Sequence, residues 1–415
     1  MNAAPIATRR QPARRRSAGG AKLWWTVHQW AGLKLALFMT FVMFTGTLAV
    51  FSHEIDWLLR PALRVAPASV TGPTDWAAVA EGAASALPSA KITRIEAPIG
   101  RGFAAQVSAI TAADELIYIY VHPTTGTVQG QGSYVGAQVI LRRMHRHLLL
   151  PVDIGVPIVS SLALLLAVTL GTAFIVYKRW WRGFLKPVRL RNARLAWGDV
   201  HRLIGVWSMW FLAVIIVTSL WYLVESLGGD APPHPSVDVP PTTLEGPALA
   251  ARLGPSLAAA QASYPDLRIE GIVFPSRRNG AFQFQGQDGA ILVRDRANAV
   301  WTSAETAETR LVSDARDLGL HQRLGEAADP LHFGTFGGLL TKIVWFAFGL
   351  ALTGLCVSGA AIYGLRIARG RDGRASAKDA ALAVWRGMGV WRWVSIAAIA
   401  TAFILLPGLL AGLAG

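Results

Sequence analysis

The chain has a single cysteine, Cys356, among its 415 residues. One thiol cannot form a disulfide within the chain or supply the thiolates of an iron–sulfur cluster, and the C-x-x-C-H motif for covalent haem attachment is absent. Charged residues are scarce as well, at 16% against 53% hydrophobic residues, which is too apolar for an ordinary soluble protein of this length. The composition therefore predicts a membrane protein, in which any haem would be bound non-covalently.

Three catalytic or nucleotide-binding motifs are also missing. Without a G-x-x-x-x-G-K-[ST] loop, ATP-driven transport is disfavoured. Without a G-x-G-x-x-G sequence after a strand, we expect no nicotinamide or flavin dinucleotide site in this chain. Without H-E-x-x-H, a zinc protease is disfavoured.

Five apolar blocks reach the roughly 20 residues that a helix needs to cross a bilayer. The first is too long, and too far from a small-residue cleavage site, to be a removable signal peptide, so we expect it to remain as an anchor. The predicted spans are Trp25–Phe51, Ile154–Tyr177, Val200–Val224, Leu339–Leu365 and Trp393–Leu413.

The net charge of +15 is concentrated in short segments beside these spans, at about 9–22, 178–194 and 366–392. This is the positive-inside pattern of a bacterial inner-membrane protein, and it predicts a cytosolic N-terminus and, with five spans, a periplasmic C-terminus. The two long connections would then be periplasmic. Residues 1–21 are predicted to form a disordered basic arm that lipid headgroups attract, and we expect no nucleic-acid partner.

Histidines recur at matching places in two parts of the chain. His28 and His201 each follow a valine and precede a glycine by four residues, Gly32 and Gly205, where an outward-going span begins. His145 and His332 lie just before the second and fourth spans, at the outer side. These matches indicate a tandem duplication of helix, exterior domain and helix, with a fifth helix appended.

Two copies packed about an axis along the membrane normal would place equivalent groups face to face. His28 would oppose His201 near the cytosol, and His145 would oppose His332 near the periplasm. Imidazole is a common axial ligand of haem iron in helix bundles, which predicts two b-type haems. The two glycines would leave room for the flat macrocycle.

Some of these assignments have alternatives. A histidine near a helix end can be a simple interfacial residue, although four at matched positions favour ligands, because ionisable residues in spans are costly. His147 lies on a different helical face from His145 and is the alternative ligand. His53 falls on nearly the same face as His28, at the outer end, and could line the outer haem or remain solvated.

Arginines beside the histidines are candidates for pairing with haem propionates, because guanidinium matches carboxylate geometry. The predicted partner inside is Arg202, and the candidates outside are Arg142, Arg143 and Arg146. For Arg202, a flanking positive charge at the inner interface is the simpler account.

The fold class predicted is a mainly α membrane protein, with a four-helix haem-binding core, a fifth helix and two α+β exterior insertions. Each insertion is expected to hold one helix followed by three strands. The helices are 76–87 and 248–262, and the strands are 91–97, 102–109, 116–122, 267–274, 281–287 and 290–295. The predicted segments are 1–21 (arm), 22–55 (span), 56–140 (exterior), 141–178 (entrance and span), 179–198 (basic loop), 199–226 (span), 227–330 (exterior), 331–366 (span), 367–390 (basic loop) and 391–415 (span).

The motifs together resemble the PepSY-associated transmembrane family over about residues 22–368. They are the helix-entrance histidines with their glycines, Thr45-Gly46 followed by Glu54-Ile55-Asp56, and Pro330-Leu331-His332-Phe333-Gly334 with Gly337-Gly338. That family includes iron-regulated inner-membrane proteins and ferric-siderophore reductases. The resemblance implies two b-type haems on the four histidines, PepSY-like periplasmic domains and electron delivery to a periplasmic ferric chelate. His147 departs from the family pattern.

We therefore expect an oxidoreductase that reduces a ferric-siderophore or another ferric chelate for iron acquisition. Its electrons would come from a cytosolic donor protein or from membrane quinol, with the basic loops as docking surfaces. Two alternatives stay open: a haem relay to another acceptor, and a non-enzymatic membrane protein whose exterior binds or regulates a periplasmic peptidase or other partner.

Overall fold

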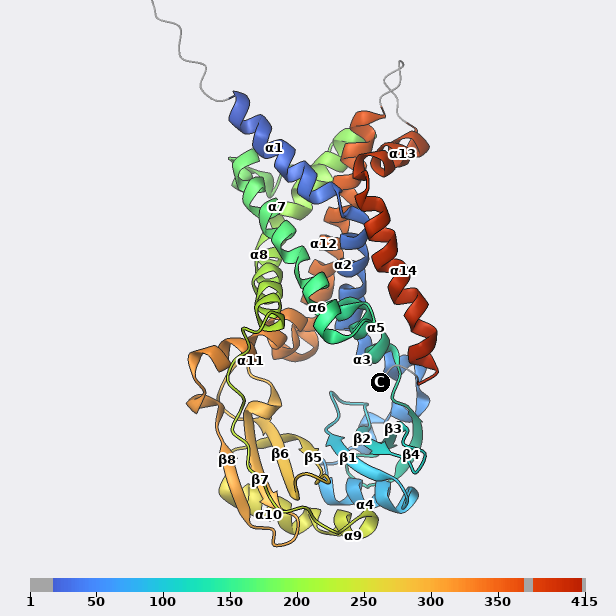
Figure 1. Cartoon of the computed structure of the whole chain (residues 1–415), viewed down its shortest axis with the longest axis vertical. Helices are drawn as coiled ribbons and strands as arrows, with labels where there is room; N and C mark the ends of the chain where they lie inside the picture. Colours follow the sequence, from blue (N-terminus) through green and yellow to red (C-terminus); the bar gives the residue numbers. More distant parts are fainter. Residues whose placement is uncertain (1–17, 369–375, 413–415) are drawn as a thin grey trace, which may run out of the picture.

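The computed structural model describes residues 18–368 and 376–412. A bundle of long helices forms one part of the molecule, and a sheet with short helices forms the other (Figure 1). Among the described residues, four helical segments have the length and composition needed to cross a membrane, and a bent pair of helices makes up to five. The four are Val152–Val176, Ala193–Ser226, Thr335–Ile367 and Trp391–Leu410.

The first predicted span is broken, which corrects the expectation of one continuous helix. Helices α1 (Ala18–Leu33) and α2 (Ala36–Val50) meet at a bend of 60°. The break falls at Lys34, whose ammonium donates a 2.8 Å hydrogen bond to the carbonyl oxygen of Gly387. The predicted basic arm lies outside the described residues up to residue 17, and its last residues, 18–21, begin α1 instead.

The remaining long helices form the rest of the bundle. They are α6 (Val152–Ser160) with α7 (Leu162–Val176), α8 (Ala193–Ser226), α12 (Gly338–Ile367) and α14 (Trp391–Leu410). Helix α12 packs against α8 and α2, and α7 packs against α1 and α8. Helix α14 contacts α2 and lies at the edge of the bundle (Figure 1).

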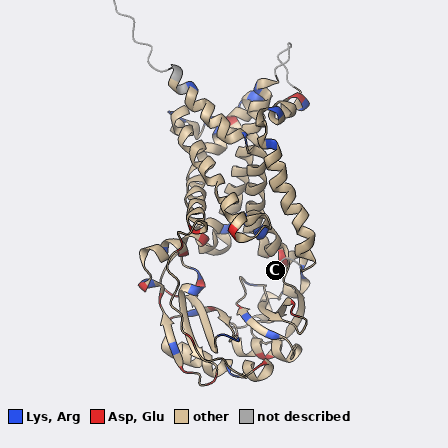
Figure 2. Cartoon of the chain, in the orientation of Figure 1, with Lys and Arg blue, Asp and Glu red and all other residues tan. Residues whose placement is uncertain are grey.

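Short helices lie at the two ends of the bundle. At the end near the sheet are α3 (Ser52–Leu59), α5 (Ala137–His147) and α11 (Leu320–Phe333), and we call this the domain end. At the opposite end lies α13 (Ala377–Met388), within the segment predicted to be a loop. Lysine and arginine residues occur around α1 and α13 (Figure 2), and we call this the basic end.

The exterior part is one antiparallel sheet with the strand order β4-β3-β2-β1-β5-β6-β7-β8. Its strands come equally from the two predicted insertions, which join through β1 and β5, with Ile95 opposite Ile272. We call residues 60–133 the first exterior module and residues 227–319 the second. The bounds are β1 Lys91–Glu96, β2 Ala105–Ile110, β3 Leu116–Val121, β4 Val128–Ser133, β5 Arg268–Val273, β6 Ala281–Gln287, β7 Asn298–Ser303 and β8 Thr309–Ser313.

Alternating burial explains how the sheet packs. In β2 every second residue is buried, and these residues form a core with α4 (Trp76–Ala86) and α10 (Leu253–Ser263). Helix α4 is capped by Asp75, whose carboxylate accepts a 3.0 Å hydrogen bond from the backbone N–H of Ala78. The helix predicted at residues 248–262 is two helices in the structure, α10 and a short helix before it, α9 (Gly246–Ala251).

The predicted strand at residues 290–295 is wrong, and two strands, β7 and β8, follow it instead. The segment is irregular, with Leu292 in the left-handed region at φ 55°. Gln287 donates to the carbonyl oxygen of Val293, and the backbone N–H of Arg294 is bound by a distant carboxylate, that of Glu326. The fourth strand of the first module, β4, was not predicted.

Candidate functional site: two facing histidine pairs

Two histidines face each other toward the basic end of the bundle. His28 comes from α1 and His201 from α8, and the centres of their rings are 6.5 Å apart with an angle of 83° between the ring planes. We call them the basic-end pair. The structure thus brings together two residues that are distant in the sequence and that the repeat predicted to oppose one another.

A second pair lies at the domain end. His145, near the end of α5, faces His332 of α11, with ring centres 6.1 Å apart and an angle of 37° between the planes. We call them the domain-end pair. His332 lies near the end of α11, just before the fourth membrane-type segment, Thr335–Ile367. From His201 to Thr218, a neighbour of His332, α8 rises roughly 25 Å, so the pairs occupy two levels of the bundle.

The spacing of the rings in both pairs matches that of two imidazoles on one metal ion. A metal–imidazole bond is about 2 Å long, so two imidazoles on opposite sides of one ion have ring centres roughly 6 Å apart. Among the described residues, no group of three or more His, Cys, Asp or Glu side chains could hold a metal ion. A haem iron needs only two axial ligands from the protein, because the macrocycle supplies the other four.

Hydrogen bonds fix the tautomer of each ring in these pairs. Nδ1 of His28 donates to the carbonyl oxygen of Thr169 at 3.0 Å, and Nδ1 of His145 donates to that of Val42 at 2.9 Å. A carbonyl oxygen can only accept, so the proton is on Nδ1 and Nε2 keeps its lone pair.

His201 and His332 use hydroxyl groups for the same purpose. Nδ1 of His201 is 2.9 Å from Oγ of Ser358, and Nδ1 of His332 is 2.9 Å from Oγ1 of Thr218. Both hydroxyls already donate to carbonyl oxygens of their own helices, so they accept from the imidazoles. Within the described residues, Nε2 of all four rings makes no hydrogen bond, which leaves it available as a metal ligand.

Sequence reasoning missed these hydroxyl partners. Thr172, which also binds Nδ1 of His28, and Ser358 and Thr218 are all buried in apolar helices. A hydroxyl residue in an apolar helix can indicate a hydrogen-bond partner for a buried polar group. The signal is weak, because the hydroxyl can instead donate to the carbonyl oxygen four residues earlier in its own helix. In each case the histidine is oriented by the other long helix of its own half of the chain, and it faces a histidine of the other half.

The glycines near the pairs differ in what surrounds them. A Cβ added at Gly32 would meet nothing within 4 Å, and one at Gly205 would touch Leu355 at 3.6 Å, so neither glycine is tightly packed. That they leave room for a macrocycle stays a prediction. Gly46 is much tighter, because a Cβ there would lie 2.5 Å from Cε1 of His145.

The two alternative histidines lie apart from the pairs. His147 is buried beside the start of α6, where its Nδ1 is 2.6 Å from the carbonyl oxygen of Leu150 and its backbone touches Gly155. His53 lies on α3 at the domain end, next to Glu54, which forms an ion pair with Lys342 of α12. Neither ring faces a second histidine in the described part of the chain.

The predicted propionate partners have the following surroundings. Arg146 is exposed on α5. Arg202 donates at 2.9 Å to Asp199 and at 2.7 Å to the carbonyl oxygen of Lys186, while its buried Nε has no partner. Their pairing with propionates stays a prediction. Arg142 lies 4.9 Å from the ring centre of Phe333, a cation–π contact that joins α5 to α11.

Carboxylates anchor both helices that carry the domain-end pair. Asp56 accepts from the first two backbone N–H groups of α5, those of Ala137 at 2.8 Å and Gln138 at 2.9 Å. Glu326 of α11 is 1% exposed and binds Arg294 and Arg296 of the second exterior module. Burial opposes ionisation of Glu326, but the two arginines outweigh it and hold its pKa at about 2.

We expect Asp56→Ala to loosen α5 at its start. The substitution removes both acceptors, and loss of such a cap costs about 0.5–2 kcal/mol. Hydrogen exchange of the α5 backbone amides should become faster, whereas Asp56→Asn, which keeps one acceptor oxygen, should have a smaller effect. Unchanged exchange in Asp56→Ala would show that this carboxylate does not hold the helix.

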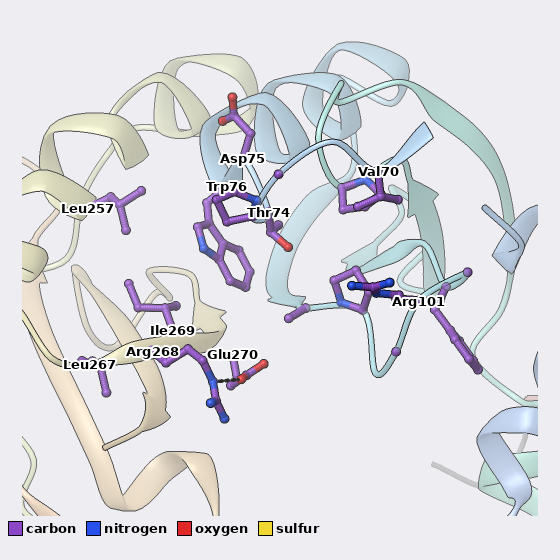
Figure 3. Close-up of a pocket in the computed structure, with 18 of the residues that line it drawn as sticks. Val70, Thr74, Asp75, Trp76, Arg101, Leu257, Leu267, Arg268, Ile269 and Glu270 are labelled. Carbon is purple, nitrogen blue, oxygen red and sulfur yellow. Dashed lines mark hydrogen bonds and ion pairs between the residues drawn. The ribbon is translucent and has the colours of Figure 1, made fainter. Parts of the chain in front are cut away.

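A cavity of about 640 Å³ lies between the two exterior modules, within the size range of ligand pockets (Figure 3). Trp76, Thr74 and Arg101 line it from the first module, and Leu257 and Arg268 line it from the second. The Arg268 guanidinium is paired with Glu270 at 2.6 Å. The cavity has both apolar walls and charged groups.

The fold and the paired histidines define a class: multi-pass helical membrane proteins with two candidate metal-binding levels and a sheet at one end. The family described as "PepSY-associated TM region" matches residues 25–366. The chain therefore belongs to the PepSY-associated transmembrane family, which confirms the resemblance drawn from the motifs. The matched range contains all four paired histidines. No curated protein sequence matches the chain.

Proposed function

We propose that this protein is an inner-membrane electron-transfer oxidoreductase with two b-type haems. His28 and His201 would hold one haem, and His145 and His332 the other. The observation that carries the proposal is the spacing of the two pairs together with four free Nε2 atoms, each on a ring whose Nδ1 is held by the protein. Haem iron at these places would carry single electrons between its ferric and ferrous states.

The charge distribution supports an orientation for this transfer. The positive-inside rule puts the basic end in the cytosol and the exterior modules in the periplasm, with the end of α14 also on the periplasmic side. The stacked pairs would then lead from the cytosolic level to the periplasmic level through a layer that excludes water.

The acceptor we propose is a periplasmic ferric-siderophore or another ferric chelate. One electron converts Fe(III) to Fe(II), and oxygen-rich ligands hold Fe(II) less strongly, so the metal is released for iron acquisition. The reaction needs no general acid and no covalent nucleophile. The protein contributes the ligands, their orientation through Nδ1, and the apolar surroundings, which together tune the potentials.

The electron donor would be a separate cytosolic protein or membrane quinol, because the sequence has no dinucleotide-binding motif. The basic segments 178–194 and 366–392 suit an acidic donor protein, since opposite charges speed encounter. Of the second segment, residues 369–375 lie outside the described residues.

The cavity between the exterior modules favours a second candidate function. A periplasmic ligand or a segment of a partner, such as a peptidase, would bind there without electron transfer, and the histidines would be structural. Haem binding separates the candidates, because a partner-binding membrane protein needs no haem.

Oxidation by ferric chelates tests the acceptor. Purified protein, reduced with dithionite and freed of excess reductant, is mixed with ferric citrate or a ferric hydroxamate siderophore in the presence of a colorimetric Fe(II) chelator. We expect reoxidation, with one trapped Fe(II) for each haem oxidised. His332→Ala should largely abolish it, and His321→Ala, an exposed histidine of α11, should not. Reoxidation by a quinone but by no ferric chelate would redirect the proposal to another acceptor.

A further inference from the structure

Helix α11 carries Glu326, Asp329 and His332 at intervals of three residues, so each is the neighbour of the next on the helix surface. The last belongs to the domain-end pair. The first two are carboxylates that contact the second exterior module, although α11 itself lies against the bundle helix α8. The position of His332 is therefore linked to the module through its own helix.

Arg294 of the second module makes most of this link. Its Nε donates to Oε2 of Glu326 at 3.0 Å, its Nη2 to Oε1 at 2.9 Å, and its backbone N–H to Oε2 at 3.0 Å. Its Nη1 donates to Asp329 at 3.0 Å. A single arginine thus holds two carboxylates one helical turn apart, with the bidentate geometry in which charge-assisted hydrogen bonds are strongest.

The contacts continue from Asp329 to His332. The hydroxyl of Tyr222, on α8, donates to the other oxygen of Asp329 at 2.6 Å, and its ring lies 5.3 Å from that of His332. Thr218, one turn earlier on α8, accepts from Nδ1 of His332. A continuous chain of contacts therefore runs from the exterior module to His332, through Arg294, Asp329 and Tyr222.

The segment that carries Arg294 is itself held in an unusual conformation. Leu292 has a positive φ of 55°, a backbone conformation that residues with a side chain rarely adopt. Two residues later, Arg294 makes three hydrogen bonds to the buried carboxylate of Glu326. Together, the backbone conformation and these bonds indicate that the position of Arg294 is closely specified.

We propose that Arg294 is a positioning residue for the domain-end haem. It fixes α11 through Glu326 and Asp329, and thereby fixes the direction in which Nε2 of His332 points. This inference rests on the proposed haem function. Loss of a residue that orients a metal ligand through another group typically weakens metal binding by about 10–100-fold.

The test is the rate of haem release from Arg294→Gln, measured by transfer to apomyoglobin, on the full-length protein in detergent. Glu326 keeps Arg296 and His234 as partners, so we expect the variant to fold. In Arg294→Gln we expect the domain-end haem to be released at least about tenfold faster than in the wild type, and the basic-end haem to be released at the wild-type rate. In Arg294→Lys the release of the domain-end haem should have an intermediate rate. The two haems are assigned by their absence from His332→Ala and His201→Ala.

The matched control is Arg316→Gln. Arg316 forms ion pairs with Asp314 and Asp288 in the same exterior module, and among the described residues it makes no hydrogen bond or ion pair with α11. It should release both haems at the wild-type rate. The midpoint potential of the domain-end haem gives a second readout, and it should change in Arg294→Gln alone. Wild-type protein with two haems and unaltered release in Arg294→Gln overturns this inference alone, whereas wild-type protein without haem overturns the proposed function as well.

Discussion

Replacing His201 with alanine is expected to halve the haem content and leave the domain-end haem intact. His201 supplies one of the two Nε2 atoms at the basic end. The other comes from His28, whose ring centre is 6.5 Å away, so His28 cannot also replace His201. Alanine would remove one of the two residues that would hold this haem. His332→Ala should do the same at the domain end, so that the two variants lose different haems.

Spectra of the oxidised and dithionite-reduced proteins would measure this, with haem quantified per chain. His147→Ala is the control for the domain end, because that ring binds the carbonyl oxygen of Leu150 and faces no histidine within the described residues. It should keep both haems. Loss of a haem in His147→Ala and not in His145→Ala would reverse the assignment of the ligand.

A single methyl group at Gly46 is expected to remove the domain-end haem. The added Cβ would lie 2.5 Å from Cε1 and 2.7 Å from Nδ1 of His145, closer than atoms in contact can be. The imidazole must then turn away from His332 and give up its hydrogen bond to Val42. Overpacking of this kind costs about 1–3 kcal/mol, and here the loss falls on the orientation of a ligand.

Gly171→Ala makes the matched control, because it adds the same methyl group to α7, another long helix, where a Cβ would meet nothing within 4 Å. We expect Gly46→Ala to retain only the basic-end haem and Gly171→Ala to retain both. A Gly46→Ala protein with both haems and wild-type spectra would show that His145 does not need its present position to bind.

The repeat in the sequence was sufficient to predict which histidines face each other. His28 and His201 share a local pattern, and His145 and His332 share a place before a span, so symmetry alone pairs them. The hydroxyl partners could not be predicted in this way. The hydroxyls of Ser358 and Thr218 donate hydrogen bonds to carbonyl oxygens of their own helices, so nothing in the local sequence marks them as partners of a histidine. They meet the histidines only because the helices pack together.

The errors in the predicted fold come from contacts between distant residues. At the break in the first span, Lys34 binds the carbonyl oxygen of Gly387, 353 residues away. The segment 290–295 begins with a short apolar run typical of a buried strand, but the carboxylate of Glu326, far away in the sequence, binds the backbone N–H of Arg294, and the segment is not part of the sheet. The joining of the two modules through β1 and β5 is likewise a tertiary contact with no local pattern.

The most direct test of the account is the haem content of the wild-type protein, purified in detergent from cells supplied with haem. We predict about two non-covalent b-type haems per chain, both low-spin with two imidazole ligands and both reducible by dithionite. Protein that is folded, as shown by its helical circular dichroism, but carries no haem would contradict the account and leave the exterior cavity as the basis for its function.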